Sequence, residues 1–307
     1  MHTILGSTGQ IAIELARELH RLGHRELRLV SRHPKAVNDS DVVRAADLLD
    51  DQQTIDAVDG SHTVWFTAGL PPDTSRWRRQ FPIMLGNAIV AARRANARLV
   101  FFDNTYMYPQ DGRVLDEDTA FAPVGAKGRV RMQLAQQVVS MMRSGMPALI
   151  ARAPEFYGPD RTKSITNSLV ITPLLAGRPA RVPVRDDVRR SLIWTPDASR
   201  ALALLGTTDD AFGHTWHLPV DDDRLDYAQL VRLAADVFGT APSYKVLPKW
   251  QMQLAGLLSS TARELWELLP RYGHDNIFVS AKFKQRFPDF RVTTYREGLA
   301  QIAAHRR

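Results

Sequence analysis

The strongest constraint on the fold of this chain is a glycine turn that begins at its sixth residue. The apolar segment Thr3-Ile4-Leu5 runs into G-S-T-G-Q-I-A, and apolar residues then recur at helical spacing until Gly23. Glycines at G-x-x-G-x-x-A spacing allow a tight turn, let the backbone approach a pyrophosphate, and aim the N–H groups of the following helix at it. The pattern predicts a dinucleotide-binding turn. Its cofactor contacts would be Gly6, Ser7, Thr8, Gly9, Gln10 and Ile11.

The end of the second predicted strand bears on the choice between NAD and NADP. Residues 24–32 read H-R-E-L-R-L-V-S-R, so Ser31 and Arg32 stand where folds that prefer NAD carry Asp or Glu. A guanidinium pairs with a 2′-phosphate and offers little to a ribose diol. We therefore expect NADP (NADPH) as the cofactor. The alternative for Arg32 is a solvated arginine at the end of a strand.

Composition excludes several classes of protein. The 307 residues include no cysteine, which rules out disulfides, thiolate metal sites and cysteine nucleophiles. No charged and apolar leader precedes the first strand, and no apolar run is long enough to span a bilayer. The basic residues behind the net charge of +7 are scattered, as helix solvation and an anionic cofactor would explain. We expect a cytoplasmic protein that binds neither nucleic acid nor membrane.

Strands and helices alternate through the first half of the chain. Apolar strand-like segments lie at 63–68, 99–102 and 148–151, and helical patterns lie at 84–92 and 130–142. Such alternation implies parallel strands joined by crossovers. After about residue 155, prolines divide the sequence into short pieces. The prediction is an α/β protein with a Rossmann-type doubly wound parallel sheet over residues 1–155. A smaller C-terminal substrate lobe would cover residues 156–307, with contributions interleaved.

Several ordered segments give the chain a family resemblance. They are the glycine turn, Asp47-Leu48, Thr67-Ala68-Gly69, Phe156-Tyr157-Gly158-Pro159, residues 190–197, Phe287-Pro288 and residues 295–299. Together they resemble the extended short-chain dehydrogenase/reductase superfamily, in its NAD(P)-dependent epimerase/dehydratase branch. The resemblance implies that Asp47, beside Leu48, hydrogen-bonds the adenine, that Thr67–Gly69 line the ribose and phosphates, and that Ala153 and Pro154 touch the nicotinamide. It also implies a homodimer. From local sequence alone, Asp47 is equally an exposed acid near a helix start.

The chain departs from this family at the catalytic helix. The family carries Tyr-x-x-x-Lys there, with both side chains on one helical face. The corresponding residues here are Lys127 and Arg131, and the region has no tyrosine. This Lys-x-x-x-Arg is similar to that of isoflavone-reductase-like members, in which lysine is the acid/base. An amine in an apolar pocket, repelled by Arg131, would release its proton readily. We therefore expect Lys127 to donate the proton and Arg131 to anchor the cofactor; the alternative for Lys127 is a solvated lysine.

The strand that carries the family's serine is altered as well. Asn104 or Thr105 falls near the serine position and could hydrogen-bond a carbonyl oxygen. Tyr106 could assist Lys127 with a phenol from the strand end, because ligands bind at strand carboxyl ends in such sheets. The alternative for Tyr106 is a partly buried aromatic residue. Glu155 is a weaker acid/base candidate at the substrate, and Arg190 stands where the resemblance implies contact with substrate phosphates. A structural ion pair is the alternative for Arg190.

Two other clusters are interpreted as structural. The pair His214-x-x-His217 lies on an apparent strand without a third ligand, so we expect no metal. The late apolar residues are expected in the core of the second lobe or at a dimer face. They are Trp250, Leu254, Leu257, Leu258, Leu265, Trp266 and Leu269.

These patterns predict an NADP-dependent oxidoreductase. Hydride would pass between the nicotinamide and a carbonyl, a carbinol or a conjugated double bond of a small-molecule substrate, which is anionic if Arg190 binds it. One alternative is a nucleotide-sugar epimerase or dehydratase that retains its cofactor. Another is a non-catalytic NADP-sensing regulator, for which the absence of Tyr-x-x-x-Lys is the argument.

Overall fold

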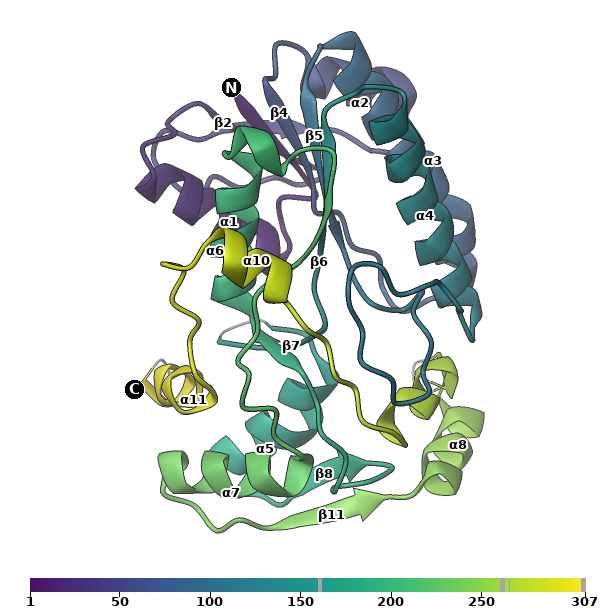
Figure 1. Cartoon of the computed structure of the whole chain (residues 1–307), viewed down its shortest axis with the longest axis vertical. Coiled ribbons are helices and arrows are strands. Elements are labelled where there is room, and N and C mark those ends of the chain that lie inside the picture. The colour runs from purple at the N-terminus through teal and green to yellow at the C-terminus, as the bar shows by residue number, and fades with distance from the viewer. Residues whose placement is uncertain (160–161, 260–262, 265, 305–307) are drawn as a thin grey trace.

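A parallel sheet forms the centre of the computed structural model, which describes residues 1–159, 162–259, 263–264 and 266–304 (Figure 1). Within these residues the sheet has seven strands, in the spatial order β10 (Thr215–His217), β6 (Ala148–Arg152), β5 (Arg98–Asp103), β4 (Thr63–Phe66), β1 (His2–Leu5), β2 (Leu27–Ser31) and β3 (Val42–Ala45). All neighbouring pairs are parallel. The strand order reverses beside β1, where such sheets bind dinucleotides. The predicted doubly wound α/β fold is confirmed.

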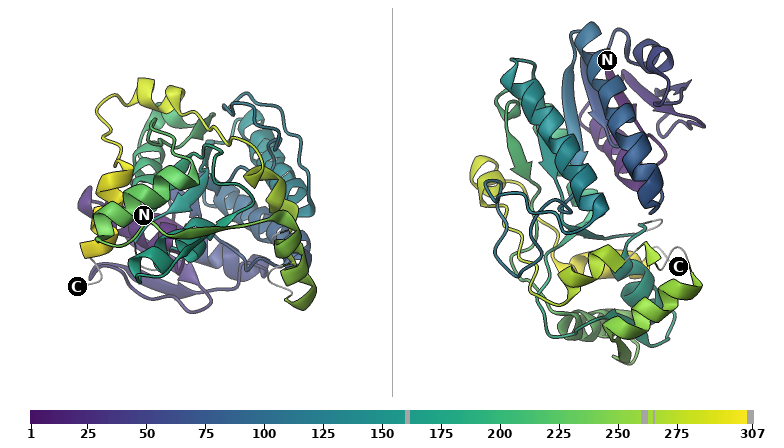
Figure 2. Two further views of the ribbon diagram at one scale, coloured as in Figure 1. Left: turned by 90° about the horizontal axis from the view of Figure 1, so that it is seen from below. Right: turned by 90° about the vertical axis from the view of Figure 1, so that its right-hand side faces the viewer.

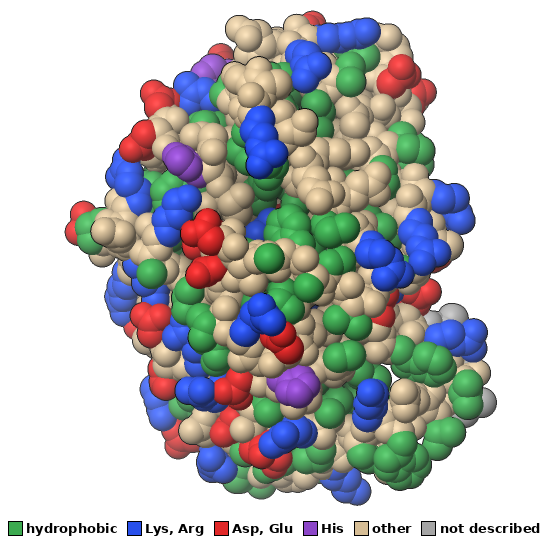
Figure 3. Space-filling model, turned by 45° about the vertical axis from the view of Figure 1, so that its right-hand side comes forward, with side chains coloured by type: hydrophobic (Ala, Val, Ile, Leu, Met, Phe, Trp, Pro, Cys, Tyr) green, Lys and Arg blue, Asp and Glu red, His purple; other side chains and the backbone are tan. Residues whose placement is uncertain are grey.

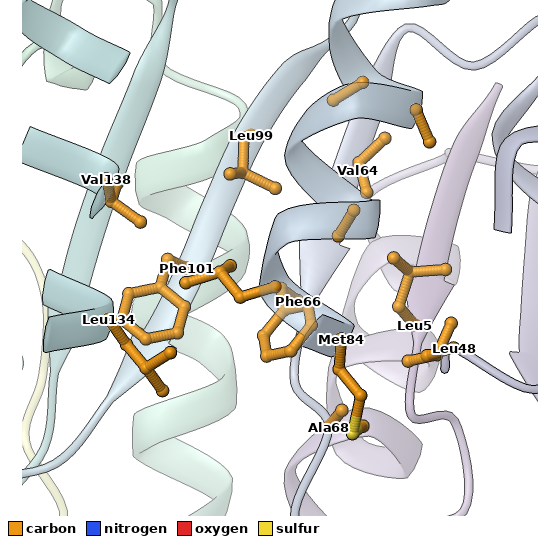
Figure 4. Packing of buried hydrophobic residues seen from close by; sticks show 14 of the residues in the cluster. Leu5, Leu48, Val64, Phe66, Ala68, Met84, Leu99, Phe101, Leu134 and Val138 are labelled. Carbon is orange, nitrogen blue, oxygen red and sulfur yellow. The ribbon is translucent and has the colours of Figure 1, made fainter. Parts of the chain in front are cut away.

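Helices cover both faces of this sheet (Figure 1). One face carries α1 (Gln10–Arg21) and α6 (Thr195–Gly206), and the other carries α2 (Asp51–Val58), α3 (Thr74–Arg94) and α4 (Ala126–Arg143). On the second face, Phe66 and Phe101 belong to one apolar cluster with Met84 of α3 and Leu134 of α4 (Figure 4). Because helices lie on both sides, central strands such as β4 are buried at every residue.

The N-termini of the helices around the sheet differ in how they are capped. Asp50 and Asp73 cap α2 and α3 by accepting from the N–H groups of Gln53 and Arg76. In contrast, α1 and α4 follow Gly9 and Gly125, so their N-cap residues have no side chain that could cap the helix. An uncapped helix start leaves N–H groups available to a ligand or to a distant side chain.

The C-terminal half forms a smaller lobe at the carboxyl ends of the strands (Figures 1 and 2). There β7 (Glu155–Tyr157) pairs with β9 (Leu192–Trp194), and β8 (Ala180–Pro183) pairs with β11 (Tyr244–Leu247). Further helical segments are η1 (Asn167–Ile171), α5 (Thr172–Leu175), α7 (Tyr227–Phe238), α8 (Lys249–Leu258), η3 (Trp266–Tyr272), α10 (Ala281–Arg286) and α11 (Tyr295–Ala304). From this half, α6 and β10 return to the large sheet. The proposed boundary at residue 155 stays a prediction.

The late apolar segment is only partly core. Trp250, Leu254 and Leu257 of α8 are more than half exposed, and Figure 3 shows apolar side chains gathered on this part of the surface. The expectation of a core position is wrong for these three, because only Gly256 of this helix is buried among its described side chains. Leu269 is buried and Trp266 half-buried, whereas Leu265 and the side chain of Leu258 lie outside the described residues. A dimer face stays a prediction.

No helix in the described ranges combines the length and the apolar character that a membrane crossing requires.

Candidate active site

The glycine turn has the geometry that a dinucleotide requires. Gly6 adopts φ = 89°, and a Cβ there would overlap the Cα of Ala68 in the loop after β4. Only glycine therefore allows β1 and β4 to approach each other at the switch point. The hydroxyl of Ser7 is buried and has no hydrogen-bond partner among the described residues. An orphaned hydroxyl beside the uncapped start of α1 fits a bound pyrophosphate.

The other predicted cofactor residues all follow carboxyl ends of strands in the same sheet. Arg32 follows β2, Asp47 and Leu48 follow β3, Thr67–Gly69 follow β4, and Ala153 and Pro154 follow β6. Arg32 and Gly69 are exposed, whereas Leu48, Ala68, Ala153 and Pro154 are buried. The hydroxyl of Thr67 donates to the carbonyl of Leu5 at 3.0 Å, and the Asp47 carboxylate accepts from the N–H of Leu49 at 3.1 Å. The fold thus brings these residues to one edge, and their roles toward a cofactor stay predictions.

Lys127 lies in an ionic cluster and not in an apolar pocket, so that expectation about its surroundings is wrong. Its Nζ donates to carboxylates of Glu264 at 2.6 Å and Glu267 at 2.9 Å, and to the hydroxyl of Thr74 at 2.7 Å. The side chain is only 2% exposed. Glu264 and Glu267 of the smaller lobe therefore lie over the start of α4. The Glu267 carboxylate also accepts from the N–H of Lys127. These charge-assisted bonds join the start of α4 in the first lobe to the smaller lobe.

Arg131 packs within the first lobe. Its guanidinium lies 3.6 Å from the Asp103 carboxylate, above the rings of Phe81 at 4.7 Å and Trp77 at 5.3 Å. Burial lowers its pKa, and Asp103 opposes that shift. Its Nε and Nη1 have no hydrogen-bond partner in the described chain. The carboxylates of Glu264, Glu267 and Asp103 therefore offset the predicted repulsion between Arg131 and Lys127. The role of Arg131 as a cofactor anchor stays a prediction.

Tyr106 occupies the place where the two lobes meet. Its ring stacks on Trp77 with centroids 6.0 Å apart, and the guanidinium of Arg271 lies 5.4 Å from its centroid. Burial raises the pKa of its hydroxyl, and the positive charges of Arg271, Arg131 and Lys127 counteract this. No hydrogen bond of the hydroxyl occurs within the described part of the chain. Tyr106 therefore carries a protonated phenol that is not committed to a protein partner.

Asn104 and Thr105, the candidates next to Tyr106, form hydrogen bonds that fix the loop after β5. The side-chain oxygen of Asn104 accepts from the N–H of Tyr106 at 3.0 Å, and the buried Thr105 hydroxyl accepts from Arg271 at 3.3 Å. Gly128 of α4 lies so close that a Cβ there would come within 2.5 Å of the Tyr106 carbonyl oxygen. Glycine at 128 therefore lets α4 pack against the Tyr106 loop.

Glu155 and Arg190 form a buried ion pair 2.8 Å long. Arg190 is 2% exposed, lies over the rings of Tyr272 and Tyr227, and donates to the carbonyl of Arg271 at 2.8 Å. Burial alone would raise the pKa of Glu155, but Arg190 and Arg271 bring it below its usual value. Thr166 and Tyr272 also donate to this carboxylate. The geometry matches the structural alternative for Arg190, and contact with substrate phosphates stays a prediction.

Four residues of this site escaped sequence reasoning: Trp77, Glu264, Glu267 and Arg271. The three from the smaller lobe meet residues 137 to 166 positions earlier in the chain. No local spacing could reveal such contacts. The sequence did contain one signal that such partners exist. Lys127 and Arg131 lie on one face of a predicted buried helix, and buried cations require acidic partners.

His217 belongs to a buried network behind the site. Its Nδ1 lies 2.8 Å from the carbonyl of Val279, and its Nε2 lies 2.7 Å from the hydroxyl of Tyr108, which also accepts from Arg152. Because a carbonyl only accepts, Nδ1 carries a proton. Burial and the charge of Arg152 lower the pKa of His217 well below its ordinary value, which favours the neutral ring. His214 lies just before this strand, and no cluster suited to a metal ion occurs among the described residues. The structural interpretation of His217 is supported by these bonds.

This network predicts a pH effect on stability. Burial lowers the pKa of His217 well below its ordinary value of 6.5. Below pH 6.5, His217 therefore binds a proton in the unfolded chain but not in the folded chain, and the folded state loses stability. Its stabilising contribution is full above pH 6.5 and declines as the pH falls. Between pH 6.5 and 5 the loss is about 2 kcal/mol. His217→Asn should flatten this dependence in urea denaturation at several pH values. His2 and His62 remain as a common background, so equal slopes in both proteins would contradict the account.

Comparisons with known proteins agree with this architecture. The sequence matches the model of the NAD dependent epimerase/dehydratase family over residues 2–218, more than two-thirds of the chain. Comparison with curated protein sequences gives no significant match.

Solved structures of the same fold cover the whole chain. MoeE5 in complex with UDP-glucose and NAD is 20% identical, with a TM-score of 0.79 and coverage of 100% of this chain and 98% of that chain. The UDP-glucose 4-epimerase of Thermus thermophilus in complex with NAD is 15% identical, with a TM-score of 0.77 and coverage of 99% and 98%. The protein gox2253 is 19% identical, with a TM-score of 0.81 and coverage of 99% and 97%. The fold, the glycine turn and the family match together show that this chain belongs to the NAD dependent epimerase/dehydratase family.

Proposed function

We propose that this chain is an NADP-dependent enzyme that oxidises and re-reduces a carbinol carbon of a nucleotide sugar, as epimerases and dehydratases do. The observation that carries the proposal is the Gly6 turn, packed on Ala68 with the orphaned Ser7 hydroxyl beside it. The nucleotide-sugar and NAD complexes of the structural neighbours support the substrate class. When bound, the nicotinamide would accept and return the hydride.

Tyr106 is the group best suited to move the proton in this reaction. Its phenol makes no hydrogen bond in the described structure and stays protonated, because burial and the charge of Glu155 raise its pKa. The charges of Arg271, Arg131 and Lys127 oppose part of that shift. Lys127, in contrast, already donates to two carboxylates and a hydroxyl. In this proposal Tyr106 exchanges the proton, Thr105 and Asn104 fix its loop, and Lys127 holds the smaller lobe over the site.

Retention of the cofactor tests the proposed reaction class. An epimerase or dehydratase regenerates its cofactor in every turnover, so purified protein should release close to one NADP per chain when it is denatured. A net oxidoreductase must exchange its cofactor and would be isolated largely without it. A net oxidoreductase is the second candidate, because the catalytic helix lacks the tyrosine of the family's Tyr-x-x-x-Lys pattern. Substrate-dependent NADPH consumption would establish that candidate and contradict the first. Exchangeable cofactor without any turnover would contradict both and favour a sensor.

Arg32 should set the cofactor preference. It is exposed just after β2, where its guanidinium can pair with a 2′-phosphate. We expect Arg32→Asp to weaken NADPH binding by roughly 10- to 100-fold, the worth of a charged hydrogen bond, and to leave NADH binding nearly unchanged. The measurement is a fluorescence titration with each nucleotide.

Arg25→Asp is the matched control, because it makes the same charge change at an exposed residue just before β2 begins. It should leave both affinities as they are. Equal affinity of the unaltered protein for NADH and NADPH would contradict the assignment of NADP.

A further inference from the structure

One side of α8 exposes an apolar surface on the outside of the smaller lobe. Trp250, Leu254 and Leu257 are each more than half exposed, and their spacings of four and three residues put them on one side of the helix. The other side of α8 packs on η3, where a Cβ at Gly256 would overlap the ring of Trp266. The three exposed side chains form the α8 apolar face, and an exposed face of this kind marks an interaction site more often than chance.

Positive charges flank the α8 apolar face at both ends of the helix. Lys245 and Lys249 come before or at its start, Arg263 follows its end, and all three side chains are exposed. The guanidinium of Arg263 donates to the carbonyl of Gly256 at 3.0 Å, which places it at the C-terminal end of α8. The sequence from residue 237 to residue 263 contains no Asp or Glu. Figure 3 shows Lys and Arg side chains at the borders of the apolar patch.

The two acids that follow in the chain do not neutralise these charges. Glu264 and Glu267 both accept from the amine of Lys127, at 2.6 and 2.9 Å, which commits their carboxylates to the start of α4. Within the described ranges no ion pair involves Lys245, Lys249 or Arg263. The α8 segment therefore combines an apolar face with positive charges that have no protein counter-charge.

We propose that the α8 apolar face docks on the surface of a membrane that carries anionic lipids. Its three apolar side chains would enter the boundary between headgroups and acyl chains, and the three cations would lie among negative headgroups. Trp and Leu on one side of a helix, with Lys or Arg beside them, are typical of helices that lie in a membrane surface. Such a helix spans nothing. The expectation of no membrane partner followed from the absence of a spanning segment, which a surface helix does not need.

The charges favour a lipid surface over a second copy of this chain. In a two-fold symmetric contact the same patch of both chains meets itself. The three cations around α8 would then lie close to their own copies, and juxtaposed like charges weaken an interface. Anionic lipids instead supply the opposite charge, so each Lys or Arg near the membrane strengthens the binding.

Cosedimentation of the full chain with lipid vesicles tests this proposal. The unaltered protein should bind vesicles of equal parts phosphatidylglycerol and phosphatidylcholine, and added salt should weaken the binding. Trp250→Gln combined with Leu254→Gln and Leu257→Gln should abolish it. Val42→Gln combined with Val43→Gln is the matched control, because it removes exposed apolar side chains from β3, at an edge of the large sheet. This control should bind the vesicles as the unaltered protein does.

Lys245→Gln combined with Lys249→Gln separates the contribution of charge. This variant should bind the phosphatidylglycerol vesicles at least about 10-fold more weakly, because two cations near an anionic surface are lost. It should bind vesicles of pure phosphatidylcholine no more weakly than the unaltered protein does.

Tryptophan fluorescence gives an independent readout of the same contact. Phosphatidylglycerol vesicles should shift the emission of the unaltered protein to shorter wavelength as Trp250 enters the lipid. Trp250→Phe keeps an apolar ring, so it should still bind but lose most of the shift.

Three results would overturn the proposal. They are no binding of the unaltered protein to phosphatidylglycerol vesicles, undiminished binding by the triple α8 variant, and a full emission shift in Trp250→Phe. A chain that forms a dimer through α8 in sedimentation velocity and does not bind vesicles would assign the face to a second copy and overturn it as well. None of these measurements involves NADP, so a protein that binds vesicles in this way but not NADP would contradict only the proposed function.

Discussion

Arg190→Met should lower the free energy of unfolding by about 3–5 kcal/mol, the cost of leaving a buried charge without its partner. The Glu155 side chain is 8% exposed and receives its closest cationic contact from Arg190 at 2.8 Å. Removal of the guanidinium also deprives the carbonyl of Arg271 of its donor. Urea denaturation followed by far-UV circular dichroism measures the loss.

Glu155→Gln in the Arg190→Met background provides the control. The double variant has no unpaired buried carboxylate, so it should recover part of the stability that Arg190→Met loses. The resemblance to the family implies a different result: a fully stable Arg190→Met protein that binds NADPH normally but binds nucleotide sugar poorly. That result would make Arg190 a substrate residue and contradict the structural ion pair.

Tyr106→Phe should slow turnover by about 10²- to 10⁴-fold, the usual worth of general acid–base catalysis. The hydroxyl makes no hydrogen bond within the described structure, so neither the melting temperature nor the NADPH affinity should change appreciably. The measurement is single-turnover reduction of bound NADP, starting with UDP-glucose, the ligand of one structural neighbour.

Tyr272→Phe is the matched control, because it removes a phenol that donates to Glu155 at 3.1 Å. It should reduce stability more than turnover. Full activity of Tyr106→Phe would contradict the proposed role and return the search to Lys127 and Glu155.

The positions of the candidate cofactor residues in the fold were predictable from the sequence, because the determinants of those positions are local; their roles stay predictions. A strand, two glycines and a helix define the turn, and parallel strands carry the remaining candidates to one edge of the sheet. Arg32 and Thr67 fall at the ends of the predicted segments 24–32 and 63–68, and in the structure they follow β2 and β4 directly. Backbone geometry, which short spacing encodes, positions these residues.

The catalytic half was not accessible, because distant charges determine it. Sequence spacing placed Lys127 and Arg131 on one helical face, and both are buried on α4. The spacing could not reveal that Glu264 and Glu267 neutralise Lys127, or that Asp103 and Trp77 hold Arg131. The environment of a buried cation depends on long-range packing, and an expectation of an apolar pocket fails wherever a distant acid reaches it.

A crystal structure of the complex with NADP tests the central claim most directly. We predict the pyrophosphate at the Gly6–Gln10 turn, near the Ser7 hydroxyl, and the nicotinamide ring at the carboxyl ends of β5 and β6 with the Tyr106 hydroxyl next to its reactive carbon. Lys127 should remain bound to Glu264 and Glu267. A nicotinamide ring that contacts the amine of Lys127 and lies away from Tyr106, or a cofactor absent from the glycine turn, would contradict the account.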